Sequence, residues 1–258
     1  MVEYIDVEEA KRRTGLRVVL TKGVPGPWSE AAKAILHVKG IPYVPVRQDG
    51  AGENRELLEW TGQTSAPVAV WNDEPPRSTS REILFLAERL APEPALLPKD
   101  ASERALVQGI ADEIHGEMGF GWSRRLVMFH PILEHANLEE PALAPMVRMA
   151  AKYGYDGPTA AKARARSFGI LAMLTQRLEA QRAAGSRFLV GRSLTAADLY
   201  WATFAALIDP LPPDLCPMPD YLRGMYTTRD EELREAARPL LAHRDAIYRE
   251  FLELPMAF

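Results

Sequence analysis

Two expected helix starts in the first hundred residues carry hydroxyl side chains where they could act on a bound anion. The first is Gly26-Pro27-Trp28-Ser29, and the second is Thr79-Ser80-Arg81-Glu82. The N–H groups at a helix N-terminus have no acceptor within the helix, and the helix dipole favours negative charge there. Both segments also have plainer interpretations. Thr79 and Glu82 have the offset of a capping box, and a serine such as Ser29 is common in a first helical turn.

The two helix starts lie in a stretch with the pattern of a small α/β domain. Short runs bounded by glycine, proline and other turn residues predict buried strands at 17–21, 43–46 and 67–71. Apolar residues at helical spacing predict helices from Pro27 up to Gly40, at 54–60 and from Thr79 to Leu90. The order strand, helix, strand begins a βαβ unit, and the turn residues at 72–77 imply a hairpin.

The second half of the chain has a different pattern. Residues 91–100 include three prolines, which is typical of a linker. Beyond them the apolar residues recur at helical spacing, and no strand pattern returns. We therefore expect an N-terminal extension at 1–16, an α/β domain at 17–90, a linker at 91–100 and an all-helical domain at 101–258.

The composition favours small-molecule partners. The 258 residues include 31 basic and 35 acidic side chains, so the net charge of −4 gives no strong field for nucleic acid. The single cysteine, Cys216, excludes an intramolecular disulfide and fits a cytoplasmic protein. No apolar run is long enough for a membrane span. His130 and His135 do not share a helical face, so we expect no metal site.

Two separated motifs together resemble the glutathione transferase superfamily. Ser65-Ala66-Pro67-Val68, followed by Thr79-Ser80-Arg81-Glu82-Ile83, is similar to the strand and helix starts of that family's first domain. The segment 188–199, FLVGRSLTAADL, is similar to the start of a core helix in its helical domain. The resemblance spans residues 17–208. It implies a thioredoxin-like glutathione-binding domain followed by an all-α domain.

The resemblance places the activating group for the glutathione thiol in the turn before Ser29. Counting back from Gly40-Ile41-Pro42-Tyr43, the position that holds serine or cysteine in the family is Gly26 here. Ser29, a backbone N–H group or Trp28 must then replace it, and Ser29 is the catalytic candidate. Because this turn has no cysteine, the serine or other subclass of bacterial-type members fits better than thiol-disulfide oxidoreductases.

The resemblance also assigns the rest of the glutathione site. A cis bond at Ala66–Pro67 would turn the backbone of Ala66 outward to pair with the cysteinyl part of the tripeptide. Thr79 and Ser80 would hold the γ-glutamyl carboxylate at the helix N-terminus. Thr79 occupies the position where the family has an acidic residue, which weakens the contact with the amino group of glutathione.

The second substrate would bind in the helical half. Met118, Trp122 and Arg125 are our candidates for an apolar pocket, beside a helix that Gly116 and Gly119 are expected to bend. The alternative is that many of these apolar side chains belong to the core. In the other motif, Thr195 and Asp198 have the offset of a capping box, so we expect Asp198 to stabilise the fold rather than to act in catalysis.

These features predict a homodimeric transferase that conjugates the glutathione thiolate to a small apolar or aromatic electrophile, with a role in detoxification. Glutathione-dependent isomerase, ether lyase and peroxidase activities would use the same thiolate and remain open. A protein of this fold that binds a ligand or partner without catalysis is the alternative from another class. Gly26 and Thr79 both favour it.

Overall fold

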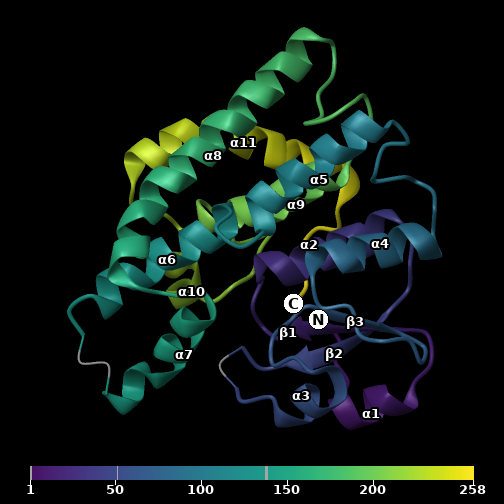
Figure 1. The fold of residues 1–258 in the computed structure, drawn as a ribbon, viewed down its shortest axis with the longest axis vertical. Helices are drawn as coiled ribbons and strands as arrows, with labels where there is room; N and C mark the ends of the chain where they lie inside the picture. Colours follow the sequence, from purple (N-terminus) through teal and green to yellow (C-terminus); the bar gives the residue numbers. More distant parts are fainter. Residues whose placement is uncertain (1, 51, 137–138) are drawn as a thin grey trace. The chain divides into compact units, whose positions relative to one another are not determined.

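Three strands and the helices around them form the first of two units in the computed structural model (Figure 1). The structure describes residues 2–50, 52–136 and 139–258. The first unit comprises residues 1–97, 211–219 and 247–258, and the second comprises 98–210 and 220–246. The chain first passes from one unit to the other within the stretch expected to be a linker. Two C-terminal segments that we expected in the helical half belong to the first unit.

The sheet of the first unit has the order β2-β1-β3. β1 (Leu16–Thr21) is parallel to β2 (Val44–Gln48) and antiparallel to β3 (Val68–Trp71). β1 and β2 are parallel, so they need a crossover, which α2 (Pro27–Val38) provides. The expected βαβ unit is therefore present. β2 begins one residue later and ends two residues later than the apolar pattern predicted.

Helices cover both faces of this sheet (Figure 1). α2 packs against α4 (Ser80–Leu90) on one face, and α1 (Val7–Arg12) packs against α3 (Arg55–Thr61) on the other. Val7 and Ala10 of α1 are buried in one cluster with Val46 and Leu57. The segment 2–16, to which the sequence assigned no role, thus contributes Val7 and Ala10 to the core of this unit.

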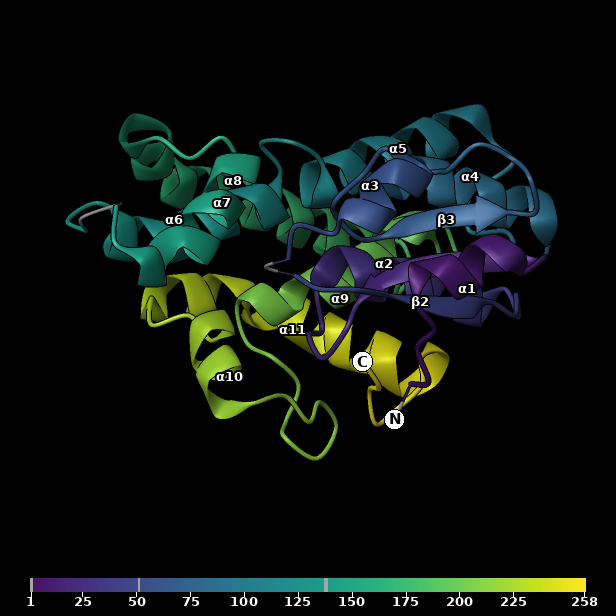
Figure 2. The same ribbon diagram turned by 90° about the horizontal axis from the view of Figure 1, so that it is seen from below.

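The second unit is built from helices and short 3₁₀ turns. They are α5 (Ala101–His115), α6 (Phe120–Leu133), η1 (Pro141–Leu143), α7 (Ala144–Lys152), α8 (Gly157–Ala183), α9 (Ala196–Phe204), η2 (Ala205–Leu207), α10 (Asp220–Tyr226) and α11 (Glu231–Phe251). Residues 247–251 of α11 belong to the first unit. α6 packs against α7 and α8, and the three lie side by side in Figures 1 and 2. α9 is buried along its whole length and forms the centre of the unit.

The expected bend between residues 116 and 121 is a break between two helices. α5 ends at His115 and α6 begins at Phe120. A Cβ atom on Gly116 would lie 2.6 Å from the carbonyl oxygen of Asp112, and one on Gly119 would lie 2.8 Å from that of Glu113. The chain can make this tight connection only with glycine at both positions, and it interrupts the helix rather than curving it.

The α/β unit and the helical unit match the fold class expected from the sequence. Among the described helices, none has the length and apolar character needed to cross a bilayer.

Candidate functional site

The strand register brings the loop before β3 to the end of β1 that leads into α2. Val19 of β1 pairs with Val68 of β3. Because the two strands are antiparallel, the residues before Val68 continue past the C-terminal end of β1. Ala66 and Pro67 therefore lie at the same end of the sheet as the turn that precedes Pro27.

The start of α4 returns to this end as well. After β3 the chain reverses, and an antiparallel bridge pairs Arg77 with Ala69. The N–H of each residue donates to the carbonyl of the other over 2.8 Å. Residues 78–80 then continue back toward the level of Pro67. Within the first unit, the starts of α2 and α4 and the loop before β3 thus meet at one end of the sheet.

The first turn of α2 follows a residue without a side-chain donor, and the N–H of that residue, Gly26, already donates to the carbonyl of Val24 over 2.8 Å. Gly26 is the N-cap residue, has extended backbone angles and provides no side-chain cap, and Pro27 follows as the first helical residue. Trp28 is half-buried, whereas Ser29 is only 3% exposed. The glycine and the half-buried tryptophan are therefore more accessible to a ligand than the serine hydroxyl.

A buried carboxyl group lies directly after Ser29 in the same turn. Glu30 is buried, and the Lys33 ammonium lies 2.9 Å from its carboxylate. Burial raises the pKa of Glu30, and the nearby Lys33 only partly opposes this effect. Burial, with a contribution from Glu30, also raises the pKa of Tyr4 and of Tyr43 to about 12. This cluster has no signal in the sequence, because Tyr4 belongs to the N-terminal segment, far along the chain from Glu30 and Tyr43.

The loop before β3 is fixed by polar contacts from β2. The Ala66–Pro67 peptide bond is cis, as the resemblance implied. The side-chain amide of Gln48 donates to the carbonyl of Thr64 over 3.2 Å, and its oxygen accepts from the hydroxyl of Thr21 over 2.8 Å. Gln48 thus connects the end of β1 with the loop that contains Ala66. Its role was not evident from the sequence, where it lies between Arg47 and Asp49 at the end of a short strand pattern.

The start of α4 has the complete capping box that its sequence predicted. The Thr79 hydroxyl accepts from the N–H of Glu82 over 3.2 Å, and the Glu82 carboxylate accepts from the N–H groups of Ser78 and Thr79 over 3.0 Å. The Thr79 hydroxyl also donates to that carboxylate. Although partial burial opposes it, these hydrogen bonds lower the pKa of Glu82. Thr79 is therefore committed to the cap, and Ser80 is the next hydroxyl, half-buried in the first turn.

Glutathione transferases are among the solved structures that this chain matches. The glutathione S-transferase of Methylobacterium radiotolerans, in complex with glutathione sulfonate, matches with a TM-score of 0.62 and 19% identity over 92% of each chain. That of Methylobacillus flagellatus, with glutathione bound, matches with a TM-score of 0.62 and 15% identity over 92% of this chain and 96% of its own. The chain has the glutathione transferase fold.

A maleylacetoacetate isomerase is also among the matched structures. The enzyme from Anaeromyxobacter dehalogenans, with dicarboxyethyl glutathione and citrate bound, has a TM-score of 0.50 and 19% identity over 92% of this chain and 87% of its own. Comparisons with protein-family models and with curated proteins gave no match.

The helical unit of this glutathione transferase fold contains the three candidates for a second-substrate pocket. Met118 is half exposed, and its carbonyl accepts from the Arg166 guanidinium. Trp122 is half-buried and packs against Tyr153, with ring centroids 5.0 Å apart. Arg125 is buried and donates to the hydroxyl of Tyr226 over 2.9 Å. Trp122 and Arg125 both contact Tyr153, whereas no contact joins Met118 to this group among the described residues.

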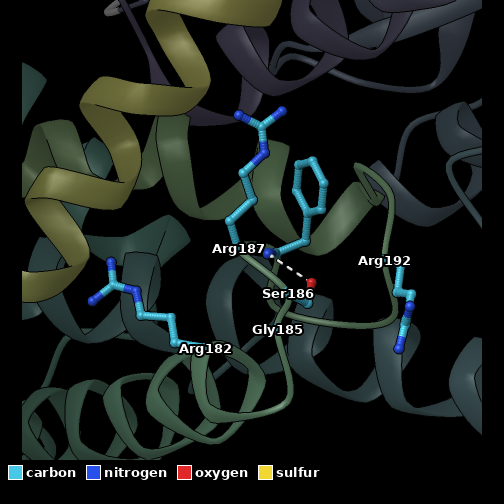
Figure 3. Close-up of a pocket in the computed structure, with 6 residues that line it drawn as sticks. Arg182, Gly185, Ser186, Arg187 and Arg192 are labelled. Carbon is cyan, nitrogen blue, oxygen red and sulfur yellow. Dashed lines mark hydrogen bonds between the residues drawn. The ribbon is translucent and has the colours of Figure 1, made fainter.

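Two concave regions of the helical unit lie apart from these candidates. A groove of about 520 Å³ between α5 and α8 has Leu106, Ile110 and Met173 among its walls. A shallow pocket of about 490 Å³ follows the C-terminal end of α8, where the exposed Arg182 and Arg187 lie with the exposed Arg192. Figure 3 shows that these three side chains point in different directions. None of Met118, Trp122 and Arg125 lines either region.

Proposed function

We propose that this chain binds glutathione at the end of the sheet where α2, α4 and the loop before β3 meet, and that it transfers the glutathione thiolate to a small apolar or aromatic electrophile. The observation that carries the proposal is this convergence, set by the pairs Val19–Val68 and Ala69–Arg77. The matched structures that hold glutathione or its derivatives support the same ligand.

Each part of the tripeptide has a suitable partner in this arrangement. The γ-glutamyl carboxylate would lie at the start of α4, where Ser80 and the positive end of the helix dipole favour an anion. The cysteinyl backbone would pair with Ala66 as an added strand. The sulfur would then lie at the start of α2, close to Gly26 and Trp28.

The chemistry requires the enzyme to stabilise a thiolate. A thiol with an ordinary pKa of about 8.5 is only a few per cent ionised at neutral pH. Lowering that pKa by two units takes about 2.7 kcal/mol, which a helix N-terminus and one charge-assisted hydrogen bond can supply. Because Ser29 is nearly inaccessible, Pro27 has no N–H and the Gly26 N–H already donates to the carbonyl of Val24, we propose the backbone N–H of Trp28 as the principal donor. Ser29 remains the side-chain candidate.

Steady-state assays with glutathione and a panel of aryl halides, enones, epoxides and aryl ethers test the proposal. We expect turnover above the uncatalysed rate with at least one class, and a lower apparent pKa of the glutathione thiol in the complex than in solution. S-Methylglutathione, which cannot form a thiolate, should bind and give no product. Absence of turnover with every class would contradict the transferase proposal.

A non-catalytic binding protein is the second candidate, because Gly26 offers no side-chain donor and the Thr79 hydroxyl is used by the helix cap. Thermal unfolding separates the two. Glutathione at 100 times its dissociation constant should stabilise the chain by about 2.7 kcal/mol in either case. Stabilisation without turnover supports the binding protein, and no stabilisation at millimolar glutathione argues against both. The matched isomerase makes cis–trans isomerisation of an acidic enone a useful further assay.

We further propose a homodimer that works in the cytoplasm, with a role in detoxification. The single cysteine, Cys216, is buried and fits a reducing compartment. Light scattering on the purified chain, at several concentrations, tests the oligomeric state. For the second substrate we retain Trp122 and Arg125, which share the contact with Tyr153, and Met118 as a candidate at the start of α6.

A further inference from the structure

Two side-chain amides and two backbone carbonyls form one hydrogen-bonded cluster in the first unit. Gln48 is the last residue of β2, and Asn54 directly precedes α3. The Gln48 amide donates to the carbonyl of Asp49 over 3.0 Å and to that of Thr64 over 3.2 Å. The Asn54 amide donates to the same two carbonyls, over 2.9 Å and 3.2 Å respectively. The carbonyl of Thr64, in the loop before β3, thus accepts from two side chains of other segments. We call these four residues the amide cluster.

Gln48 is fixed on the sheet side of the amide cluster. It is only 3% exposed, and its side-chain oxygen accepts from the Thr21 hydroxyl over 2.8 Å. Thr21 ends β1 and is the register partner of Gln48. The backbone N–H of Lys22 also donates to the Gln48 carbonyl over 3.0 Å. A buried amide needs acceptors for its donors, and one of those acceptors lies in the loop before β3.

Asn54 has a backbone conformation that is uncommon for a residue other than glycine. Its φ is 50°, in the left-handed region, where asparagine is tolerated better than most residues. It occupies the N-cap position of α3, but its side chain makes no cap hydrogen bond. Instead, its side-chain oxygen accepts from the N–H of Asp49 over 3.1 Å, while its amide donates to Thr64. A side chain of the type that usually caps a helix is thus used for the amide cluster.

The loop before β3 is held at two closely spaced points. The carbonyl of Thr64 accepts from both amides, and Ala66 packs against the buried cluster that includes Val46 and Val68. Only Ser65 lies between these two points, so the peptide groups of Ala66 have little freedom to rotate. An added strand binds well when the backbone groups that it meets are already oriented, because binding then orders less of the protein.

We propose that Gln48 and Asn54 are positioning residues of the glutathione site. They hold the Thr64 carbonyl and thereby orient the backbone of Ala66, which pairs with the cysteinyl part of glutathione. Neither side chain contacts the ligand in this assignment. The inference rests on the proposed function and adds a consequence for specificity. The site recognises the cysteinyl amide N–H of the ligand, and it does so only while the amide cluster is intact.

Two ligands that differ only at the cysteinyl amide test this inference. They are glutathione and its analogue with a methylated cysteinyl nitrogen. The analogue keeps the thiol and both carboxylates but lacks the N–H that would donate to the carbonyl of Ala66. Calorimetry measures the Kd of each ligand without an electrophile. The native chain should bind glutathione about tenfold more tightly than the analogue, since the analogue leaves a polar group of Ala66 unpaired.

Two variants remove the donors of the amide cluster one at a time. Gln48→Met keeps the length of the side chain, and Asn54→Gly tolerates the left-handed backbone. Each should weaken glutathione binding until the preference over the analogue is about threefold or less, and each should leave the Kd of the analogue within about twofold. A merely structural effect would change both Kd values by the same factor. The exposed Gln63→Met is the matched control and should keep the native preference.

An unchanged preference in the folded variants would overturn the inference, and Asn54→Gly decides alone if Gln48→Met does not fold. Equal binding of the two ligands by the native chain would overturn it as well, although glutathione binding itself would stand. Failure of the proposed function appears differently. A preference that depends on Gln48 and Asn54, without turnover of any electrophile, would contradict the transferase and support the role of the amide cluster. No binding of glutathione would contradict both.

Discussion

Ala69 and Arg77 exchange two backbone hydrogen bonds, each 2.8 Å long. This bridge aligns the returning chain with β3 three residues before α4 begins. Together with the packing of α4 against α2, it holds the start of α4 at the end of the sheet that carries the loop before β3. The same register that builds a small sheet thus brings the start of α4 and the loop that contains Ala66 to one end of the sheet.

Substitutions of the neighbouring residues Thr79 and Ser80 should change different properties: the first the free energy of unfolding, the second the Kd for glutathione. Thr79→Ala removes the side-chain acceptor for the Glu82 N–H, so it should lower the free energy of unfolding by about 1 kcal/mol and change the glutathione Kd little. Ser80→Ala should weaken glutathione binding about tenfold, because a hydrogen bond to a carboxylate is worth about 1.5–3 kcal/mol. Urea unfolding and calorimetry with glutathione measure the two effects.

The comparison includes its own control, since each variant is the reference for the other. If Thr79→Ala weakens glutathione binding as much as Ser80→Ala, the cap and the ligand site cannot be separated. The assignment of the γ-glutamyl carboxylate to Ser80 alone would then be wrong.

Ser29→Ala should retain most of the transferase activity. Ser29 is only 3% exposed, so its hydroxyl is poorly accessible, and we propose the N–H of Trp28 as the donor to the thiolate. We expect kcat/KM to fall by less than about threefold, which corresponds to less than 0.7 kcal/mol. The pH profile of kcat/KM should keep its acidic limb. A loss of a hundredfold or more, with the limb shifted toward the pKa of free glutathione, would make the Ser29 hydroxyl the activating group.

Local patterns predicted much of the first unit. Proline after Gly26 and the Thr79–Glu82 offset mark two helix starts, because capping depends on residues within one turn. Other side-chain hydrogen bonds join residues that are far apart in the sequence. Gln48 reaches Thr64, and Arg125 reaches Tyr226 across 101 residues. No periodicity in the sequence indicates such pairs, because the two partners belong to different segments of the chain.

The burial of individual residues was equally hard to predict. Ser29 and Arg125 both have polar side chains near helix starts, where exposure is the usual state. Both residues are buried in the structure. The segment 2–16 also contributes Val7 and Ala10 to the core. Such burial depends on which elements pack together, which the amphipathic pattern of one helix does not determine.

The buried Glu30 should make the free energy of unfolding depend on pH. Its pKa is raised in the folded state above the ordinary value of 4.5, so folding favours the protonated form. This contribution is fully present below pH 4.5 and is lost as the pH rises through the raised pKa. Relative to Glu30→Gln, the native chain should therefore lose stability as the pH rises from 4.5 through the raised pKa of Glu30.

Urea unfolding of both proteins across this pH range tests the prediction, with the difference between them as the observable. Lys33→Met is the matched control, because it removes the cation that opposes the effect of burial and should enlarge the loss. Parallel pH profiles for the native chain and Glu30→Gln would mean that Glu30 does not titrate differently in the folded state.

Asp198 should be essential for stability and dispensable for the chemistry. Its buried carboxylate accepts from the N–H of Leu189 over 2.8 Å, from the N–H and hydroxyl of Thr195 over 3.0 and 2.8 Å, and from His243 over 2.9 Å. Asp198→Ala leaves these buried donors without an acceptor, which should cost about 3–5 kcal/mol of unfolding free energy. Thr195→Ala removes one of these donors and should cost about 1 kcal/mol. At temperatures where both variants are folded, KM for glutathione should equal that of the native chain. A folded Asp198→Ala variant of native stability but without turnover would instead assign this carboxylate to the reaction.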